Sequence, residues 1–535
     1  MWLAEGVPNL PDGLKTVGTS VEREAMAPPR RRIARSLLPL LLSASLASLA
    51  VPAPAAAAAG SRSRFPTTAA DRVPVRPASL VPSSQARGLS LGGGGVRASS
   101  DSRTAEVSAC SSMWATGIGL TWLQDGEGHV EATIRTGREA GTLGPPVEIE
   151  ADEPDHAPDP GTPESRTERR ATPFWWTGGS RCLSFSLSVP GGVAVRGVEA
   201  VFLNTSGTAG GPGDARAARS VATEAEATVG GAPIPGMVYR AGWGADDDLN
   251  NCDPYFAPAL KMAFVHHTAG TNDYAASEVD DILRGIQYFH TQVRGWCDIA
   301  YNFLIDRFGT IYVGRKGGPS LPTVPGATQG FNTGSTAVAM MGNYSTVGVP
   351  LGSRRALERL LAWRLDVAHL KPTGWATMTS AGGDHNKYPA GTKVTMKLIS
   401  GHRRTGYTEC PGNNLAALLP SIRTAVAARH APKIWRPRLS EATLTPGSGE
   451  VTFRAEGSGP LDWRIRVLDA EGLSIRSWRR QDATAIELVW KGKGKPGWTW
   501  AAAGDYMVIF TATNNAGKPA RSAALPLEIT EPAAP

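Results

Sequence analysis

The chain has 535 residues, which predicts several domains at about one per 100–200 residues. Its formal net charge of +7 is mild for this length and excludes the dense basic stripe typical of a nucleic-acid-binding protein. The positive excess suits attraction to an anionic polymer or a membrane surface, and a solvated arginine-rich surface explains it equally well.

Residues 1–59 are predicted to be an export signal region. Three consecutive arginines end at Arg32, an apolar run extends from about Leu37 to Leu49, and an alanine-rich stretch follows. This order is typical of a secretory signal peptide, and the apolar run is too short for a membrane span. We therefore expect Met26 to be the true start, and a secreted mature protein without a transmembrane span.

Two segments are predicted as linkers around a small β-rich accessory domain. Residues 60–104 and 205–236 are rich in small residues and proline, a composition typical of disordered linkers. Between them, residues 105–204 contain runs that alternate apolar and polar residues, as strands do. Glu148 to Arg170 is acidic and rich in proline and predicts a surface loop. Residues 174–176, Phe-Trp-Trp, fill a β-sandwich core or stack on sugars.

The chain contains five cysteines. Four cysteines can pair in three ways, and their positions within the predicted domains favour Cys110 with Cys182 and Cys252 with Cys297. This pairing leaves Cys410 as the odd thiol, as expected of a metal ligand. Disulfides indicate an oxidising, extracellular setting.

Residues 237–431 alternate apolar runs with helical patterns, which predicts an α/β domain with a mixed sheet. Apolar residues from Val279 to Val293 recur at helical spacing. Further helices are expected after Ser353 and Asn413 as N-caps, the second with Pro420 inside it. Strands are expected at residues 263–267, 301–306, 310–313, 336–341 and 398–400.

Three residues of this domain form a candidate metal site. His266 ends an apolar strand, and His402 and Cys410 share one short loop. Histidine and cysteine are ligands that zinc selects, and three protein ligands leave a fourth position open, as in catalytic zinc sites. His267 is the rival of His266, but adjacent strand residues point to opposite faces, so only one of them can reach the metal.

Ordered motifs between about Val238 and His430 resemble the zinc amidase domain shared by phage amidases, bacterial cell-wall amidases and peptidoglycan recognition proteins. The matching segments, in chain order, are Arg240–Ala245, Val265–Ala269, Gly295–Ile305, Gly309–Arg315, Gly330–Thr333, Gly342–Tyr344 and His402–Cys410. This resemblance implies an N-acetylmuramoyl-L-alanine amidase that cuts the amide joining muramic acid to the stem peptide of peptidoglycan.

The resemblance also implies roles for individual residues. It makes His266 the ligand of the histidine pair, with His402 and Cys410, and it places a catalytic tyrosine at Tyr301. Thr408 stands where phage enzymes have lysine and many recognition proteins have threonine, so its hydroxyl could contact the substrate carbonyl or only pack in the loop. Substrate-binding roles are expected for His267, which could also be a hydrogen-bonded core residue, and for Arg315, Asn332 and Asn343.

Three positions depart from the family pattern. Arg404 stands in place of a frequent aspartate, Thr328 in place of a histidine, and Val313 in place of a glutamate. Members that only bind peptidoglycan typically lack the cysteine ligand, so Cys410 favours catalysis. A non-catalytic peptidoglycan receptor and a wall-associated scaffold are the alternatives.

Residues 432–535 return to alternating patterns and resemble an immunoglobulin-like β-sandwich. Arginines and lysines lie among the tryptophans of this region, so it could bind wall glycans or anionic wall polymers; core tryptophans with a basic rim are the other interpretation. The tryptophans are Trp463, Trp478, Trp490, Trp498 and Trp500.

The predicted architecture is thus multidomain, with a central α/β amidase domain between two all-β sandwich-like domains. We expect a secreted, cell-wall-associated zinc enzyme whose partner is peptidoglycan, as a muramyl peptide, and not nucleic acid.

Overall fold

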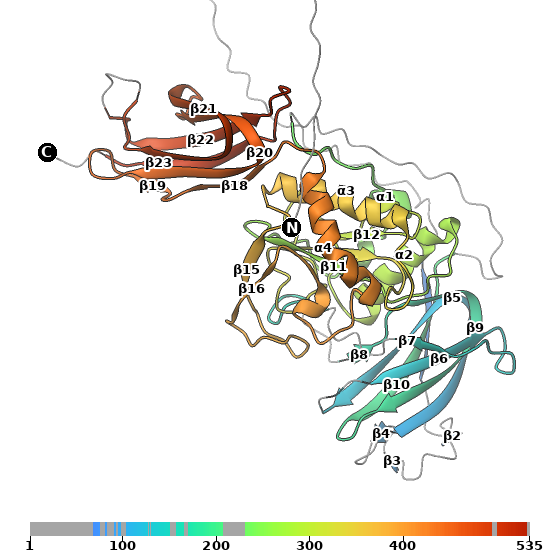
Figure 1. Ribbon diagram of the computed structural model, residues 1–535. Coiled ribbons are helices and arrows are strands. Elements are labelled where there is room, and N and C mark those ends of the chain that lie inside the picture. The colour runs from blue at the N-terminus through green and yellow to red at the C-terminus, as the bar shows by residue number, and fades with distance from the viewer. Residues whose placement is uncertain are drawn as a thin grey trace, which may run out of the picture. The chain divides into compact units, whose positions relative to one another are not determined.

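The computed structural model describes residues 68–206 with gaps at 75–80, 83–89, 93–94, 98–102, 127, 129, 150–156 and 165–168, and then residues 230–494 and 500–531 (Figure 1). The predicted export signal and most of both predicted linkers lie outside the described residues. Among the described residues, no helix combines the length and apolarity that crossing a membrane requires.

The N-terminal region forms a sheet of ten strands among its described residues, in the order β3-β4-β10-β5-β9-β6-β7, with β1, β2 and β8 paired beside this path. The strands are β1 (Ala69–Pro74), β2 (Val81–Pro82), β3 (Ser90–Gly92), β4 (Gly95–Arg97), β5 (Arg103–Asp125), β6 (Glu131–Gly137), β7 (Val147–Ile149), β8 (Arg169–Ala171), β9 (Trp175–Val189) and β10 (Ala194–Asn204).

Part of the segment predicted as a disordered linker instead forms strands of this sheet. β1 pairs antiparallel with β10 over six residues, from Ala69 opposite Asn204 to Pro74 opposite Glu199. The composition of β1 resembles that of a linker. However, the adjacent strand β10 offers unpaired backbone N–H and C=O groups, and pairing with β1 satisfies the hydrogen-bonding groups of both strands. Cys110 and Cys182 lie opposite each other on β5 and β9 and form the predicted disulfide.

The central region contains the predicted mixed sheet, in the order β13-β12-β14-β11-β17. Its strands are β11 (Met262–His267), β12 (Phe303–Ile305), β13 (Ile311–Val313), β14 (Ser335–Met340) and β17 (Ile399–Gly401). All pairs are parallel except β12 with β13. Every residue of β11 and β14 is buried, as expected for a sheet covered on both faces.

Helices cover the two faces of this sheet (Figure 1). Val338 and Met340 of β14 pack in the cluster that contains residues of α3 (Leu351–Val367) and α4 (Asn413–Ala428). Ala337 and Ala339, which alternate with them, pack in the cluster that contains residues of α2 (Val279–Tyr288). Successive side chains of β14 point to opposite faces of the sheet, so α3 and α4 cover one face and α2 covers the other. The remaining elements are α1 (Arg240–Trp243), η2 (Asp247–Leu249), η3 (Ala276–Glu278) and the hairpin of β15 (Trp375–Thr379) and β16 (Lys393–Lys397).

Two of the predicted helix starts need correction, whereas the helix predicted from Val279 to Val293 has the expected extent. α3 begins at Leu351 after Pro350, and Ser353 lies buried in its first turn, where its hydroxyl donates to the Asp306 carbonyl. Asn413 is the first residue of α4 and not its cap, because Gly412 precedes the helix with a φ of +86°. The helix that begins at Val279 continues past α2 as the π-helical turn η4 (Phe289–Val293).

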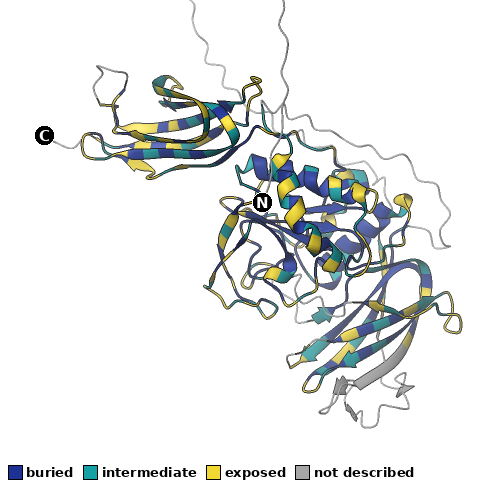
Figure 2. Ribbon diagram, viewed as in Figure 1, coloured by how far each residue is buried: buried dark blue, intermediate teal, exposed yellow. Residues whose placement is uncertain are grey.

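The C-terminal region forms a separate sheet in the order β18-β20-β22-β23-β19, with β21 paired to β20. Its strands are β18 (Ile434–Leu439), β19 (Thr443–Leu444), β20 (Val451–Leu468), β21 (Ser474–Trp490), β22 (Gly504–Thr513) and β23 (Ala523–Ile529). Along much of β20 and β22, buried residues alternate with partly buried or exposed ones (Figure 2).

Most of the described tryptophans of this region are core residues. Trp463 and Trp490 are buried, and Trp478 packs against Phe453 and Trp490 with ring centroids 5.7 and 6.3 Å away. Trp500 is exposed, and Trp498 lies outside the described residues. The arrangement matches core tryptophans better than a glycan-stacking surface.

Candidate metal centre

The three predicted metal ligands come together at one edge of the central sheet. β11 and β17 are parallel, with Val265 opposite Gly401, so His266, the next residue of β11, and His402, which directly follows β17, lie at the same end of the sheet. His402 opens the turn η5 (His402–Arg404), and the loop after it returns with Cys410. The candidate ligand atoms of His266, His402 and Cys410 all lie within 4.8 Å of one another, and all three residues are buried.

Backbone hydrogen bonds fix the loop that carries His402 and Cys410. The Arg403 amide donates to the Cys410 carbonyl at 2.8 Å, which closes the loop upon itself. The Cys410 amide donates to the Thr408 hydroxyl oxygen at 3.0 Å. Gly412 follows with positive φ, and a Cβ there would lie 2.3 Å from the Tyr344 backbone. The close approach of these two segments therefore requires glycine.

The two ring nitrogens of His266 face different partners. Nδ1 lies 3.7 Å from Cys410 Sγ, on the side where the ligand atoms converge. Nε2 lies 3.2 Å from the hydroxyl oxygen of Thr328. Ligand histidines characteristically use their second nitrogen for such an orienting hydrogen bond. The sequence identified Thr328 only as a departure from the family pattern, since nothing in its spacing links it to His266.

His267 points away from the ligand cluster. Its side chain is buried, and Nδ1 accepts a hydrogen bond from the Tyr344 amide at 3.2 Å. Its backbone amide donates to Cys410 Sγ at 3.4 Å. His267 therefore contributes a backbone donor to the sulfur, and its side chain is a hydrogen-bonded core residue, one of the two roles that the sequence left open.

The donor set fits zinc. Ligand atoms about 2.0–2.3 Å from a tetrahedral zinc lie about 3.5 Å apart, close to the separation of Cys410 Sγ and His266 Nδ1. An amide hydrogen bond to the sulfur also favours the thiolate, which is the form that binds metal.

Tyr301 lies beside the cluster, and Thr408 lies on the loop. The Tyr301 and His266 ring centroids are 5.6 Å apart, and Tyr301 is buried just before β12. Thr408 is half-buried, and its hydroxyl oxygen accepts from the Cys410 amide. That hydrogen bond gives Thr408 a role in holding the loop.

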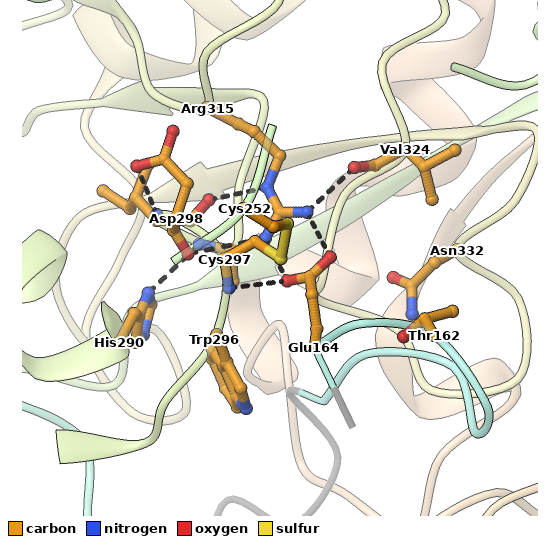
Figure 3. A network of polar contacts seen from close by, with 12 residues as sticks. Thr162, Glu164, Cys252, His290, Trp296, Cys297, Asp298, Arg315, Val324 and Asn332 are labelled. Carbon is orange, nitrogen blue, oxygen red and sulfur yellow. Dashed lines mark hydrogen bonds and ion pairs between the residues drawn. A yellow bond between two sulfur atoms is a disulfide. The ribbon is translucent and has the colours of Figure 1, made fainter. Parts of the chain in front are cut away.

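Arg315 is buried and forms an ion pair with a carboxylate from the N-terminal region, that of Glu164. Its guanidinium nitrogens lie 2.7 Å from both carboxylate oxygens of Glu164 (Figure 3). Tyr255 and the Cys297 amide also donate to this carboxylate. Burial by itself raises the pKa of Glu164, but the charge and hydrogen bonds of Arg315 outweigh burial and hold the pKa below its usual range.

Asn332 is hydrogen-bonded to a second carboxylate from the N-terminal region, that of Asp159. Its side-chain amide donates to Asp159 Oδ1 at 2.8 Å, and the Gly330 amide donates to the same oxygen. Burial raises the pKa of Asp159, and these hydrogen bonds only partly offset it. The side-chain oxygen of Asn332, Oδ1, accepts from the backbone amides of Ala327 and Thr328. Asn332 therefore positions the segment that carries Thr328 to His266.

Asn343 lies in a turn close to the cluster. The Asn343 backbone amide donates to the side-chain oxygen of Asn272, whose side-chain nitrogen donates to the Asn343 carbonyl. The side-chain oxygen of Asn343 accepts from the Ser345 amide. The second predicted disulfide, between Cys252 and Cys297, joins the segment beside Glu164 to the preceding loop. Cys410 is the one cysteine outside a disulfide.

The central domain is similar in sequence to known proteins. The family model for N-acetylmuramoyl-L-alanine amidase matches residues 256–413. The chain is 30% identical over 182 residues to peptidoglycan-recognition protein SC2 of Drosophila simulans, covering 34% of the chain and 82% of that protein. It is 33% identical over 136 residues to peptidoglycan recognition protein 1 of Bos taurus, covering 25% of the chain and 69% of that protein.

Solved structures similar to the chain include Drosophila PGRP-LB, at 24% identity and a TM-score of 0.28, covering 35% of this chain and 92% of that chain. The endolysin amidase LysCS from Clostridium intestinale is 22% identical with a TM-score of 0.25, covering 34% and 91%. On the strength of the sequence matches, the chain belongs, through its central domain, to the N-acetylmuramoyl-L-alanine amidase and peptidoglycan recognition protein family.

Proposed function

We propose that this protein is a secreted, zinc-dependent amidase that hydrolyses the amide between N-acetylmuramic acid and L-alanine in peptidoglycan. The observation that carries the proposal is the buried convergence of His266, His402 and Cys410 within 4.8 Å. When bound there, zinc would lower the pKa of a coordinated water to about 7 and polarise the substrate carbonyl.

The chain's own residues supply the rest of the proposed chemistry. His266 Nδ1, His402 and Cys410 Sγ hold the metal, while Thr328 fixes the His266 ring and the His267 amide supports the sulfur. The phenol of Tyr301, beside His266, can orient the attacking water and donate a proton to the developing oxyanion. The Thr408 hydroxyl can donate to the carbonyl while its oxygen accepts from the Cys410 amide.

The family and the disulfides support the proposed substrate class and location. The relatives are named for peptidoglycan recognition, which supports a muramyl peptide as the ligand. Two disulfides support a secreted protein that acts at the cell wall. The same names favour a second candidate, a peptidoglycan receptor that keeps the metal site without turnover.

The test uses the full mature chain, with its zinc quantified, and a purified muropeptide. The wild type should release new free alanine amino termini without new reducing sugar ends, and Cys410→Ala should lower the rate at least a hundredfold. Glu139→Gln, an exposed site on the N-terminal sheet, is the control and should leave the rate unchanged. A zinc-loaded wild type that binds the muropeptide without cutting it would transfer the assignment to the receptor.

A further inference from the structure

The proposed catalytic groups of this chain are buried, and part of the N-terminal region packs beside one of them, Tyr301. The structure describes two stretches of that region, residues 157–164 and 169–176, that contact the central domain; we call them the covering segments. His266 and Cys410 are 0% exposed and Tyr301 is 2% exposed. A substrate must reach these groups, so the segments that bury them must move before it can bind.

One covering segment brings two buried carboxylates. Glu164 forms a two-point ion pair with Arg315, in which the side chains are 0% and 3% exposed. Asp159 accepts from Asn332 and Gly330 and is also buried. Both partners are residues that the family resemblance marked for substrate binding. The carboxylates of an acidic peptide would compete for the same two side chains.

The other covering segment places an aromatic side chain, that of Phe174, beside Tyr301; we call this side chain the plug. Pro173 and Phe174 line, with Tyr301, His290 and Trp296, a cavity of about 20 Å³. A space of this size holds about one water molecule, whereas ligand pockets measure about 300–1,000 Å³. While Phe174 is in place, the space beside Tyr301 on this side is therefore too small for a muramyl peptide.

The surface of the central domain has a shape complementary to the Phe174 ring. Gly285 of α2 lacks a side chain where Phe174 packs, since a Cβ there would lie 2.3 Å from the Phe174 ring. Phe174 and Trp176 belong to the same buried cluster as Leu283 and Tyr301, and not to the core of their own sheet. The buried Arg294 side chain also donates to the Ala171 carbonyl at 2.8 Å.

We propose, on the basis that the chain is the amidase described above, that the covering segments occupy its substrate groove and hold it in a latent state. Glu164 and Asp159 take the places of substrate carboxylates, Phe174 closes the space over Tyr301, and both segments must withdraw before a muramyl peptide enters. Burying an ion pair costs desolvation free energy that the attraction only partly repays, which keeps the closed state releasable.

The test measures access to Cys410 separately from turnover. Cys410 is the one thiol outside a disulfide, so a thiol reagent applied to the metal-free full chain reports exposure of the metal site. Glu164→Gln removes the charge that pairs with Arg315, and Phe174→Ala removes the plug. Each should raise the labelling rate at least tenfold, and each zinc-loaded variant should turn over a muropeptide at least tenfold faster than the wild type.

Two controls separate opening from general loss of stability. Glu139→Gln removes an exposed carboxylate of the same region and should change neither rate. Ile134→Ala leaves a cavity in the core of the N-terminal sheet, a cluster that includes neither Glu164 nor Phe174, and reports the labelling that destabilisation alone produces.

The outcomes distinguish this inference from the proposed function. Faster labelling without turnover in any variant would keep the cover and overturn the amidase. A wild type that turns over rapidly, with labelling and turnover unchanged by Glu164→Gln and Phe174→Ala, would keep the amidase and overturn the cover. Labelling that rises no more than in Ile134→Ala would also overturn the cover.

Discussion

Thr328 lies outside the candidate ligand set and contacts one of its members, His266. Its hydroxyl oxygen lies 3.2 Å from His266 Nε2 and fixes the ring that presents Nδ1 to the metal position. Thr328→Val keeps the shape and removes this hydrogen bond, so we expect zinc affinity to fall by about 10–100-fold. Competition with a chromophoric chelator measures it. Thr328→Ser should retain most of the affinity, and equal affinities of the wild type and the valine variant would contradict the assignment.

Glu164 predicts a pH dependence of stability with a definite sign. Its pKa is lowered in the folded chain, so its contribution is fully present above the unfolded value of about 4.3 and is lost as pH falls through the lowered value. Asp159 acts oppositely: its pKa is raised, so its contribution is largest at low pH and is lost as pH rises through that raised value.

The measurement is the free energy of unfolding in urea between pH 7 and pH 3. The wild type should exceed Glu164→Gln by an amount that is constant near neutrality and shrinks below about pH 4. Asp159→Asn, read in parallel, removes the opposing contribution. Wild-type and Glu164→Gln profiles that remain parallel to pH 3 would show that Glu164 is not paired in solution.

At the scale of single residues, sequence alone reached the ligands but not their surroundings. His266, His402 and Cys410 could be predicted because their chemistry and the strand-to-loop pattern are local features. The ion pair of Glu164 with Arg315 spans 151 positions, and no local pattern connects its partners. Arg315 and Asn332 were predicted to bind substrate, and the structure places the chain's own carboxylates on both.

At the scale of elements, α4 contains a proline that sequence placed correctly inside the helix. Pro420 is exposed at the eighth position of Asn413–Ala428, where proline cannot donate to the carbonyl of residue 416. Pro420→Ala should therefore raise the free energy of unfolding by up to about 3 kcal/mol, without changing turnover. Urea unfolding measures the change. Ala417→Gly, at an exposed position of the same helix, should lower stability by about 1 kcal/mol, and destabilisation by Pro420→Ala would contradict the account.

Elements were predictable where hydrophobic pattern and tertiary environment agree. The five strands of the central sheet follow apolar runs and appear within two residues of their predicted bounds. β1 was missed because a short strand with linker-like composition is stabilised by its neighbour β10 and not by its own pattern. The first turn of α3 was misplaced because Ser353 bonds the Asp306 carbonyl instead of capping the helix.

At the scale of the whole molecule, the accessory region does more than the sequence indicated. Its acidic, proline-rich stretch was predicted as a surface loop, yet its described residues include the buried Asp159 and Glu164. The aromatic Phe174 was expected in a sandwich core or on a sugar, and it packs against α2 of the central domain. Both differences arise from residues far along the chain: Arg315 pairs with Glu164, and Gly285 leaves space for the Phe174 ring.

The central claim is that this chain cleaves the muramoyl–alanine amide with the metal held by His266, His402 and Cys410. The most direct measurement is mass spectrometry of both product halves after zinc-loaded full chain carrying Glu164→Gln has acted on a purified muropeptide, beside the same chain also carrying Cys410→Ala. The account predicts equal amounts of intact disaccharide bearing its lactyl group and of peptide with a free N-terminal alanine, and neither product from the double variant. Intact muropeptide, cleavage at another bond, or equal product from both chains would contradict it.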